Sequence, residues 1–164
     1  MKKGTVLKPG DKVGVAAPSA LFKTSSLNAS LKALKKMGLV PVLASNIKAK
    51  DFIYSGTPAQ RADGFLELAH RDDIKAIWCM RGGYGCWNVA AAISESPAPK
   101  TPKILIGMSD VTSLHLACQK SWGWTGLHAA LFSRLGHLKS KSLEYKALSE
   151  TLFDSSFRLI VDKN

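Results

Sequence analysis

Short β-rich runs alternate with segments of helical periodicity along almost the whole chain, and this alternation restricts the fold more than any other feature. The expected strands are Lys12–Pro18, Val40–Ala44, Ile74–Met80, Ile104–Met108 and Trp124–His128. The expected helices are Ser25–Gly38, Thr57–His70, Tyr84–Ile93, Val111–Trp122 and Ser142–Phe153. Such a pattern predicts an α/β fold with an open, mainly parallel sheet of about five strands and helices on both faces.

The turns that follow the strands are expected to gather along one edge of this sheet. Crossovers between parallel strands are right-handed, so every strand points the same way. Ligands of open α/β sheets bind at the edge where the strands end. The turns expected there are Pro18-Ser19, Arg81–Gly85, Ser109-Asp110 and the region of His128. We therefore expect a flavodoxin-like domain with its functional site on this rim.

One of these turns carries a serine, in the stretch Gly107-Met108-Ser109-Asp110-Val111. A serine between a strand and a helix is placed as in a nucleophile elbow, a tight turn that holds Oγ outside the sheet. Gly107 would relieve crowding below the turn, and the amides of Asp110 and Val111 could donate to an oxyanion. The second glycine of that pattern is absent, and spacing alone favours a simpler alternative, in which Ser109 or Asp110 caps the helix.

A second turn, Arg81-Gly82-Gly83-Tyr84-Gly85, is rich in glycine. Glycines let the backbone pass close to a ligand, and the amides at a helix start favour an anion. Arg81 adds a cation that can hold a carboxylate by two hydrogen bonds. The stretch is neither a Walker loop nor a dinucleotide fingerprint, so it does not specifically indicate a nucleotide. The alternative is a tight turn in which Arg81 pairs with a nearby acid.

Charge and cysteine content narrow the function classes. The net charge is +11, but the lysines are scattered and no nucleic-acid motif is present, so we favour a solvated basic surface over nucleic-acid binding. Cys79, Cys86 and Cys118 match no metal or redox spacing and are expected to be buried thiols. No apolar run is long enough to span a membrane, and the basic start lacks the apolar core of a secretory signal. These features predict a cytoplasmic protein without metal or cofactor.

Three stretches together resemble one protein family. They are KPGDKVGVAAPS, YSGTPAQRADGFLELAHRDDIKAIWCMRGGYG and KILIGMSDVTSLH, in this order. They are similar to the N-terminal half of the LD-carboxypeptidases, or murein tetrapeptide carboxypeptidases, a family that includes the microcin C immunity peptidases. The resemblance covers most of residues 7–128. It implies a serine peptidase that removes the terminal D-alanine from murein tetrapeptide in peptidoglycan recycling.

The resemblance also implies roles for individual residues. Ser109 corresponds to the nucleophile of the family, and the amides of Asp110 and Gly83 correspond to its oxyanion hole. The residues implied on the substrate side are Arg81, Gly82 and Tyr84. In this family a glutamate and a histidine that assist the nucleophile come from a C-terminal domain.

The histidines of this chain are poor substitutes for that missing base. His115 lies six residues after Ser109, about 9 Å of helical rise, and is expected to be a core or boundary residue. His70 is expected at the opposite edge of the sheet, and His137 lies in a loop that the pattern does not place. His128 is the candidate on the correct rim, with no role that the resemblance implies.

Without its base a serine is a weak nucleophile, so the chain alone is expected to be inactive or weakly active. Residues 1–155 are then the nucleophile-bearing domain. Residues 156–164, with the strand-like stretch Phe157–Asp162, would lead to a C-terminal domain that the chain lacks. The expected partners are a murein peptide and that C-terminal domain, with neither a specific nucleic acid nor a membrane, and a homodimer is an open alternative.

Two other functions are compatible with the residues. The first is a non-catalytic module of the same fold that binds an anionic peptide or has a regulatory role. The second is a flavodoxin-like binder of a nucleotide or phosphate, which only the charge and the glycines support.

Overall fold

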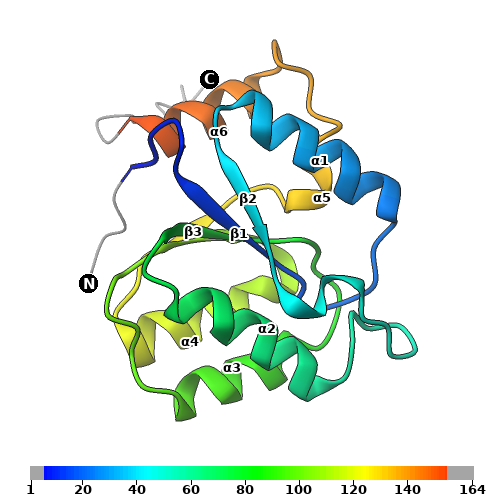
Figure 1. Ribbon diagram of the computed structural model, residues 1–164, viewed down its shortest axis with the longest axis vertical. Coiled ribbons are helices and arrows are strands. Elements are labelled where there is room, and N and C mark those ends of the chain that lie inside the picture. The colour runs from blue at the N-terminus through cyan, green and yellow to red at the C-terminus, as the bar shows by residue number, and fades with distance from the viewer. Residues whose placement is uncertain (1–5, 155–164) are drawn as a thin grey trace, which may run out of the picture.

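The computed structural model describes residues 6–154, which form one parallel sheet between two layers of helices (Figure 1). The strand order is β2-β1-β3-β4-β5, and every adjacent pair is parallel. The strands are β1 (Lys12–Ala16), β2 (Val40–Leu43), β3 (Ile74–Cys79), β4 (Ile104–Gly107) and β5 (Gly126–His128). The predicted α/β class is confirmed, and the strand order is the one found in flavodoxin-like folds.

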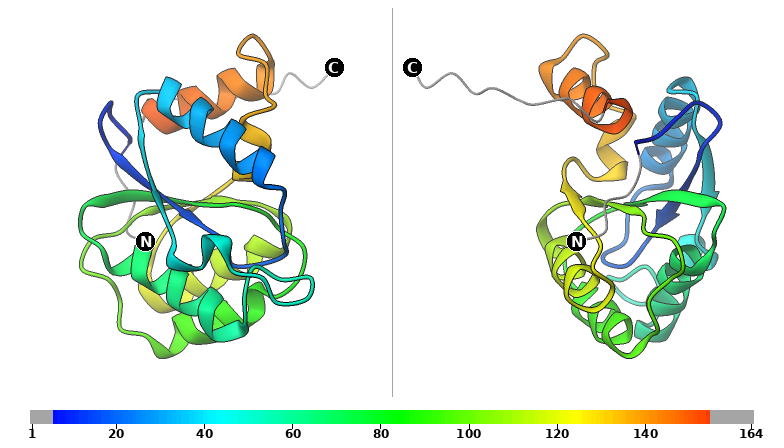
Figure 2. Two further views of the ribbon diagram at one scale, coloured as in Figure 1. Left: turned by 45° about the vertical axis from the view of Figure 1, so that its right-hand side comes forward. Right: turned by 90° about the vertical axis from the view of Figure 1, so that its left-hand side faces the viewer.

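Helices cover both faces of the sheet, as Figure 2 shows. One layer consists of α1 (Thr24–Lys36), α5 (Phe132–Leu135) and α6 (Leu143–Phe153), and the other of α2 (Pro58–His70), α3 (Cys86–Glu95) and α4 (Thr112–Trp122). Each layer has its own buried apolar cluster. Neighbouring residues of β3 divide between them, with Ile77 facing the α2–α4 layer and Trp78 facing the α1–α6 layer, because side chains alternate along a strand.

The start of α2 is fixed by local sequence signals. Thr57 Oγ1 accepts a hydrogen bond from the Gln60 amide at 3.3 Å, and Gln60 Oε1 accepts one from the Thr57 amide at 2.9 Å. Pro58 occupies the first helical turn, where its missing N–H costs nothing. These contacts form a capping box, which stabilises the helix start.

Two predicted elements begin two residues later than expected. The helix predicted from Tyr84 starts at Cys86, because Gly83 and Gly85 have φ values of +122° and +112°, outside the helical range. The strand predicted from Trp124 starts at Gly126, because the Trp124 amide still bonds to a carbonyl at the end of α4.

The helix α5 and the short 3-10 turn η1 (Ser45–Lys48) were not predicted. One turn of α5 packs beneath the central strand: Trp78 Nε1 donates to the Ala130 carbonyl at 2.8 Å, and its ring meets Phe132 edge-on at 5.6 Å. The start and end of the described chain are joined by a 2.8 Å hydrogen bond from the Leu7 amide to the Leu152 carbonyl. The predicted strand Phe157–Asp162 lies outside the described residues.

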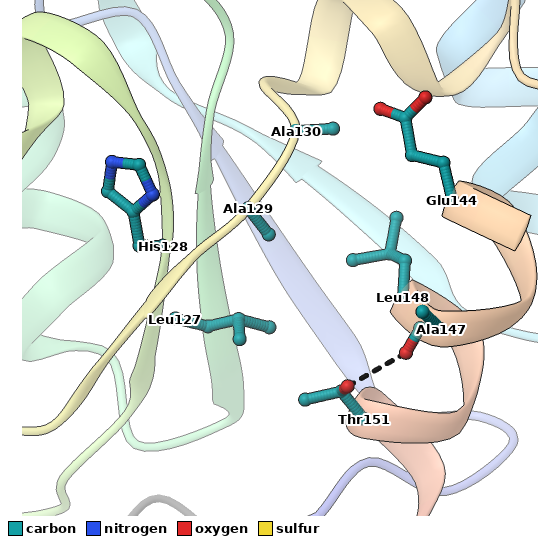
Figure 3. Close-up of a pocket in the computed structure, with 8 residues that line it drawn as sticks. All are labelled: Leu127, His128, Ala129, Ala130, Glu144, Ala147, Leu148 and Thr151. Carbon is teal, nitrogen blue, oxygen red and sulfur yellow. Dashed lines mark hydrogen bonds between the residues drawn. The ribbon is translucent and has the colours of Figure 1, made fainter. Parts of the chain in front are cut away.

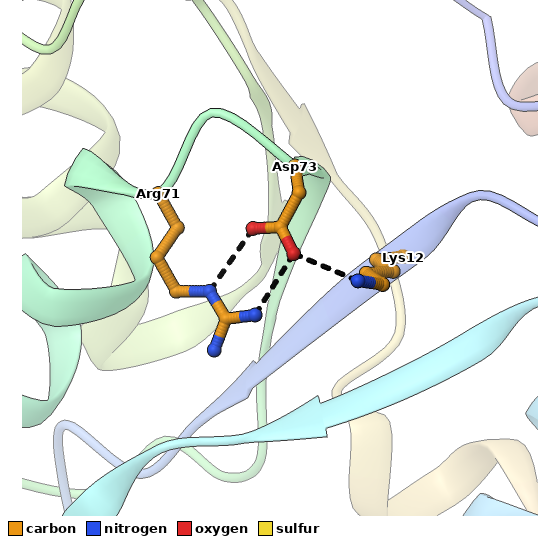
Figure 4. A network of polar contacts seen from close by, with 3 residues as sticks. All are labelled: Lys12, Arg71 and Asp73. Atoms are coloured by element: carbon orange, nitrogen blue, oxygen red, sulfur yellow. Dashed lines mark hydrogen bonds and ion pairs between the residues drawn. The ribbon is translucent and has the colours of Figure 1, made fainter.

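A small ionic network lies where β1 and β3 begin, at the edge of the sheet opposite the turns that follow the strands (Figure 4). The Asp73 carboxylate accepts from Lys12 Nζ at 2.8 Å and from two nitrogens of Arg71 at 2.9 and 3.0 Å. Arg71 and Lys12 hold the pKa of the Asp73 carboxyl well below its usual range. The groups are solvent-exposed, so the network contributes little to stability.

The three cysteines are free and buried, as expected. Burial raises the pKa of Cys118 to about 12 and those of Cys79 and Cys86 further. Because the thiolate is the reactive form, iodoacetamide at pH 8 is expected to label none of them in the folded protein and all three in urea. Mass spectrometry checks this, and labelling of one thiol in the native protein at the rate of a free cysteine would contradict it.

Candidate active site

The turn after β4 holds Ser109 at the surface in an unusual backbone conformation. Ser109 is exposed and has a φ of +62°. This left-handed conformation costs a residue with a Cβ on the order of 1–3 kcal/mol, and such residues cluster at active sites. Below it, a Cβ on Gly107 would lie 2.7 Å from Val111 Cγ1, so only glycine fits. A strained turn between strand and helix, with an exposed serine at its apex, is the geometry of a nucleophile elbow.

The alternative that Ser109 or Asp110 caps the following helix is wrong. A short 3-10 turn, η2 (Ser109–Val111), precedes α4, and no side chain caps the first amides of either. The Asp110 carboxylate points instead to the neighbouring turns. Its Oδ2 accepts from the Ser19 hydroxyl at 2.6 Å and from the Cys86 amide at 3.1 Å.

The glycine turn and the serine turn lie against each other. A Cβ built on Gly82 would lie 3.1 Å from Ser109 Cβ and 3.3 Å from its Oγ. On the other side of the turn, a Cβ on Gly83 would lie 2.7 Å from Ala20 Cβ. Among residues 6–154, the amides of Gly83 and Asp110 have no hydrogen-bond acceptor, so both are free to donate to a ligand.

Arg81 and Tyr84 flank the glycines and are both exposed. Arg81 Nη1 donates to the Leu21 carbonyl at 2.6 Å, which fixes one side of the guanidinium and leaves its other donors available. Within the described part of the chain Arg81 pairs with no carboxylate, contrary to the alternative of a local ion pair. The Tyr84 side chain is 75% exposed beside the same turn. Their roles toward a substrate stay predictions.

The sequence interpretation missed a buried cation beneath the glycine turn. Arg61 is 2% exposed; its Nη2 donates to Asn88 Oδ1 at 3.1 Å, and its guanidinium carbon lies 4.7 Å from the centre of the Tyr54 ring. A Cβ on Gly85 would lie 3.1 Å from the same nitrogen. Helical spacing contained the signal, because Arg61 lies one turn before buried Phe65 and so shares its inward face.

The histidines do not contact Ser109. His115 is half-buried, its Nε2 has no hydrogen-bond partner among residues 6–154, and burial, with His128 as a lesser cause, lowers its pKa. His128 is exposed and pairs in register with Gly107 of β4, and the two imidazole rings lie 6.3 Å apart. The expectation that His115 is a boundary residue is confirmed.

A groove of about 220 Å³ lies between β5 and α6 (Figure 3). Its lining is mainly apolar, with Leu127 and Leu148 on opposite walls, and Glu144 at one end. The His128 ring is turned away from these side chains in Figure 3. Ser109 is not part of the lining, so this groove is not the candidate site.

Within the described residues, no group of three or more His, Cys, Asp or Glu side chains is arranged to hold a metal ion. No helix among them is long and apolar enough to cross a membrane.

Comparison with known proteins identifies the family of this domain. Residues 13–129 match the model of the LD-carboxypeptidase N-terminal domain. The chain is 34% identical over 131 residues to a probable murein peptide carboxypeptidase of Bacillus subtilis, covering 80% of this chain and 41% of that protein. It is 30% identical over 126 residues to the murein tetrapeptide carboxypeptidase of Pseudomonas aeruginosa, covering 76% and 41%.

The fold also matches solved structures of microcin immunity proteins. The microcin C7 self-immunity protein MccF in its wild-type apo state superposes with a TM-score of 0.78 at 26% identity, over 94% of this chain and 48% of that one. The chain thus spans somewhat less than half the length of these relatives. The match over residues 13–129 shows that the chain belongs to the LD-carboxypeptidase family, as its N-terminal domain.

Proposed function

We propose that this chain is the nucleophile-bearing half of a serine LD-carboxypeptidase that releases the terminal D-alanine of murein tetrapeptides in the cytoplasm. The observation that carries the proposal is the exposed Ser109 at φ +62°, in contact with the glycine turn and beside two free amides. The names of the relatives from Bacillus subtilis and Pseudomonas aeruginosa support the substrate class.

In this proposal Ser109 Oγ attacks the carbonyl carbon of the bond before D-alanine, and its proton passes to a base. The carbonyl oxygen becomes negatively charged, and the amides of Gly83 and Asp110 donate to it. Such preorganised donors are among the largest contributions to catalysis. The bond to D-alanine then breaks as the amine takes a proton, and water hydrolyses the acyl-serine ester. Arg81 would hold a substrate carboxylate, with Gly82 and Tyr84 beside it.

The base is proposed to come from a second domain of the same enzyme. His115 is a poor base for Ser109, because its free nitrogen is buried and the residue lies about 9 Å further along the helix. A glutamate and a histidine from a C-terminal domain, as in the family, would complete the site. Residues 1–155 would then be the nucleophile domain, and 156–164 would lead to the second one.

The experiment is D-alanine release from a murein tetrapeptide, measured by coupled D-amino-acid oxidation. We expect little release by the chain alone and at least about a 100-fold gain when a C-terminal half from the family is fused or added, since a general base contributes about 10²–10⁴-fold. A tetrapeptide ending in L-alanine is the matched control and should stay intact.

Other results would favour other accounts. Full activity of the chain alone would mean that a base within it, with His128 as the first candidate, serves Ser109. Saturable binding of the tetrapeptide without release in either form would favour the non-catalytic peptide-binding or regulatory module. Preference for a nucleotide over the peptide would favour the phosphate-binding alternative.

A further inference from the structure

The Asp110 side chain joins three turns that follow three different strands. Asp110 itself lies in η2, the turn that follows β4. Its Oδ2 accepts a hydrogen bond of 2.6 Å from the hydroxyl of Ser19, which lies in the turn after β1. The same oxygen accepts from the amide of Cys86, after β3, at 3.1 Å. Ser19 is 1% exposed and Cys86 is fully buried, so water competes little for these bonds. One carboxylate oxygen therefore connects the rim across three neighbouring strands of the sheet.

This carboxylate replaces a cap that α3 lacks. Gly85 stands at the N-cap position of α3 and has no side chain with which to bind the first amides of the helix. Cys86 is the first residue of α3, and its amide points to Asp110 instead. A carboxylate is favoured at a helix start by hydrogen bonding and by the helix dipole. The cap therefore comes from the nucleophile turn, 24 residues further along the chain.

Ser19 contacts the glycine turn at other residues than Ser109 does. Its Oγ lies 3.0 Å from the Tyr84 carbonyl as well as 2.6 Å from Asp110, so its single proton has two acceptors, of which the charged one is the stronger. The neighbouring Ala20 packs on Gly83. The glycine turn thus contacts both the Ser19 turn and Ser109, and Asp110 bonds to Ser19 and directly follows Ser109 in the chain.

We propose that the Asp110 carboxylate is a positioning residue, with Ser19 as its partner, that sets the distance between the glycine turn and the Ser109 nucleophile. This role of the carboxylate is separate from that of the Asp110 backbone amide, and the carboxylate neither donates nor accepts a proton in the reaction. The proposal rests on the proposed function in one respect, that the positioned amides stabilise an oxyanion.

Hydrogen exchange tests the positioning directly and needs no activity. In Asp110→Ala the Cys86 amide loses its acceptor, and we expect it to exchange at least about tenfold faster while amides in β3 and β4 stay protected. Asp110→Asn keeps a neutral acceptor and should recover part of the protection. Ser19→Ala should shift the Gly82 and Gly83 amide resonances. Unchanged exchange at Cys86 in Asp110→Ala would overturn the proposal.

Binding of a peptide boronic acid, in which boron replaces the carbonyl carbon of the bond to D-alanine and D-alanine itself is absent, tests the consequence for the site. The Ser109 oxygen forms a bond to boron, the hydroxyl proton is released to solvent, and the tetrahedral boronate carries the charge of an oxyanion. We expect Asp110→Ala to lower the affinity at least about tenfold and Asp110→Asn to restore part of it. The backbone amide of residue 110 is present in each variant, so the difference reports the carboxylate.

Thr57→Ala is the matched control, because it removes the side-chain cap of α2 in the same layer, and the Thr57 hydroxyl bonds to the Gln60 amide and not to Ser19, the glycine turn or Asp110. It should lower stability as the loss of a cap does and leave boronate affinity unchanged. Equal losses of affinity in Thr57→Ala and Asp110→Ala would reduce Asp110 to a stabilising cap and overturn the proposal. Equal boronate binding by the wild type and Ser109→Ala would instead contradict the proposed function, and the exchange result would still decide the positioning.

Discussion

Ser109→Ala in the proposed fusion with a C-terminal half from the family is expected to lower D-alanine release by at least about 10⁴-fold while leaving the domain folded. The alanine keeps the Cβ and the left-handed backbone, so the turn and both free amides stay in place. Only the oxygen that would form the acyl-enzyme is lost, and positioned amides alone give a small residual rate. Release rates together with an unfolding curve of each protein measure both effects, and a variant that kept its rate would show that Ser109 is not the nucleophile.

Ser109→Gly is the matched variant that separates chemistry from strain. It removes the same hydroxyl, and glycine adopts φ +62° without the cost that serine carries. Part of this gain is offset because glycine is freer in the unfolded chain. We therefore expect equal inactivity and a folded state more stable than that of Ser109→Ala by up to about 1 kcal/mol. Such a result would show that the domain sacrifices stability to present this serine; equal stability of the two variants would count against strain at residue 109.

Trp78→Ala is expected to cause the largest loss of stability, about 3–5 kcal/mol. The Trp78 side chain is fully buried in the central strand, and it contacts Phe132 and bonds to the Ala130 carbonyl. Its removal leaves a cavity and an unpaired carbonyl, and it detaches α5 from the sheet. Urea unfolding followed by circular dichroism measures the change.

The control uses the same residue type at the surface. Trp87 lies in α3 and is 69% exposed, so Trp87→Ala should change the free energy of unfolding by no more than about 0.5 kcal/mol. Comparable losses in the two variants would mean that Trp78 does not hold the α1–α6 layer to the sheet. This pair separates burial from any general effect of losing an indole.

Periodicity predicted the fold well because each strand and each long helix has a strong local signal. The five strands and five of the helices were placed within a few residues. The helix α5 was not predicted, because a single helical turn is too short to show a hydrophobic period. Lys103 escaped for another reason: a lysine is expected at the surface, whereas here it is buried, and its ammonium group bonds to the Thr101 carbonyl at 3.2 Å beside the Trp124 ring. The contact between Lys103 and Trp124 joins separate segments of the chain and therefore leaves no local pattern.

The turns that form the candidate site could be predicted from the sequence, but the hydrogen bonds that connect them could not. A parallel sheet, which strand–helix alternation predicts, brings Ser109 and the glycine turn to one edge. Spacing alone nevertheless favoured a cap at residues 109–110, because backbone strain cannot be read from residue type. The roles of the Asp110 carboxylate and of Ser19 depend on hydrogen bonds across 24 and 91 positions of sequence, which a motif does not encode.

The hydrogen bond between Leu7 and Leu152 has a consequence for how the domain can be rebuilt. Because these two residues meet, a short linker between them would connect α6 to β1 without disturbing either cluster. A new start could then be made between Lys139 and Ser140, in an exposed loop far along the chain from the turns around Ser109 and Gly83. We expect the circularly permuted polypeptide to retain every strand pairing, in which case the rim forms without the native chain connectivity.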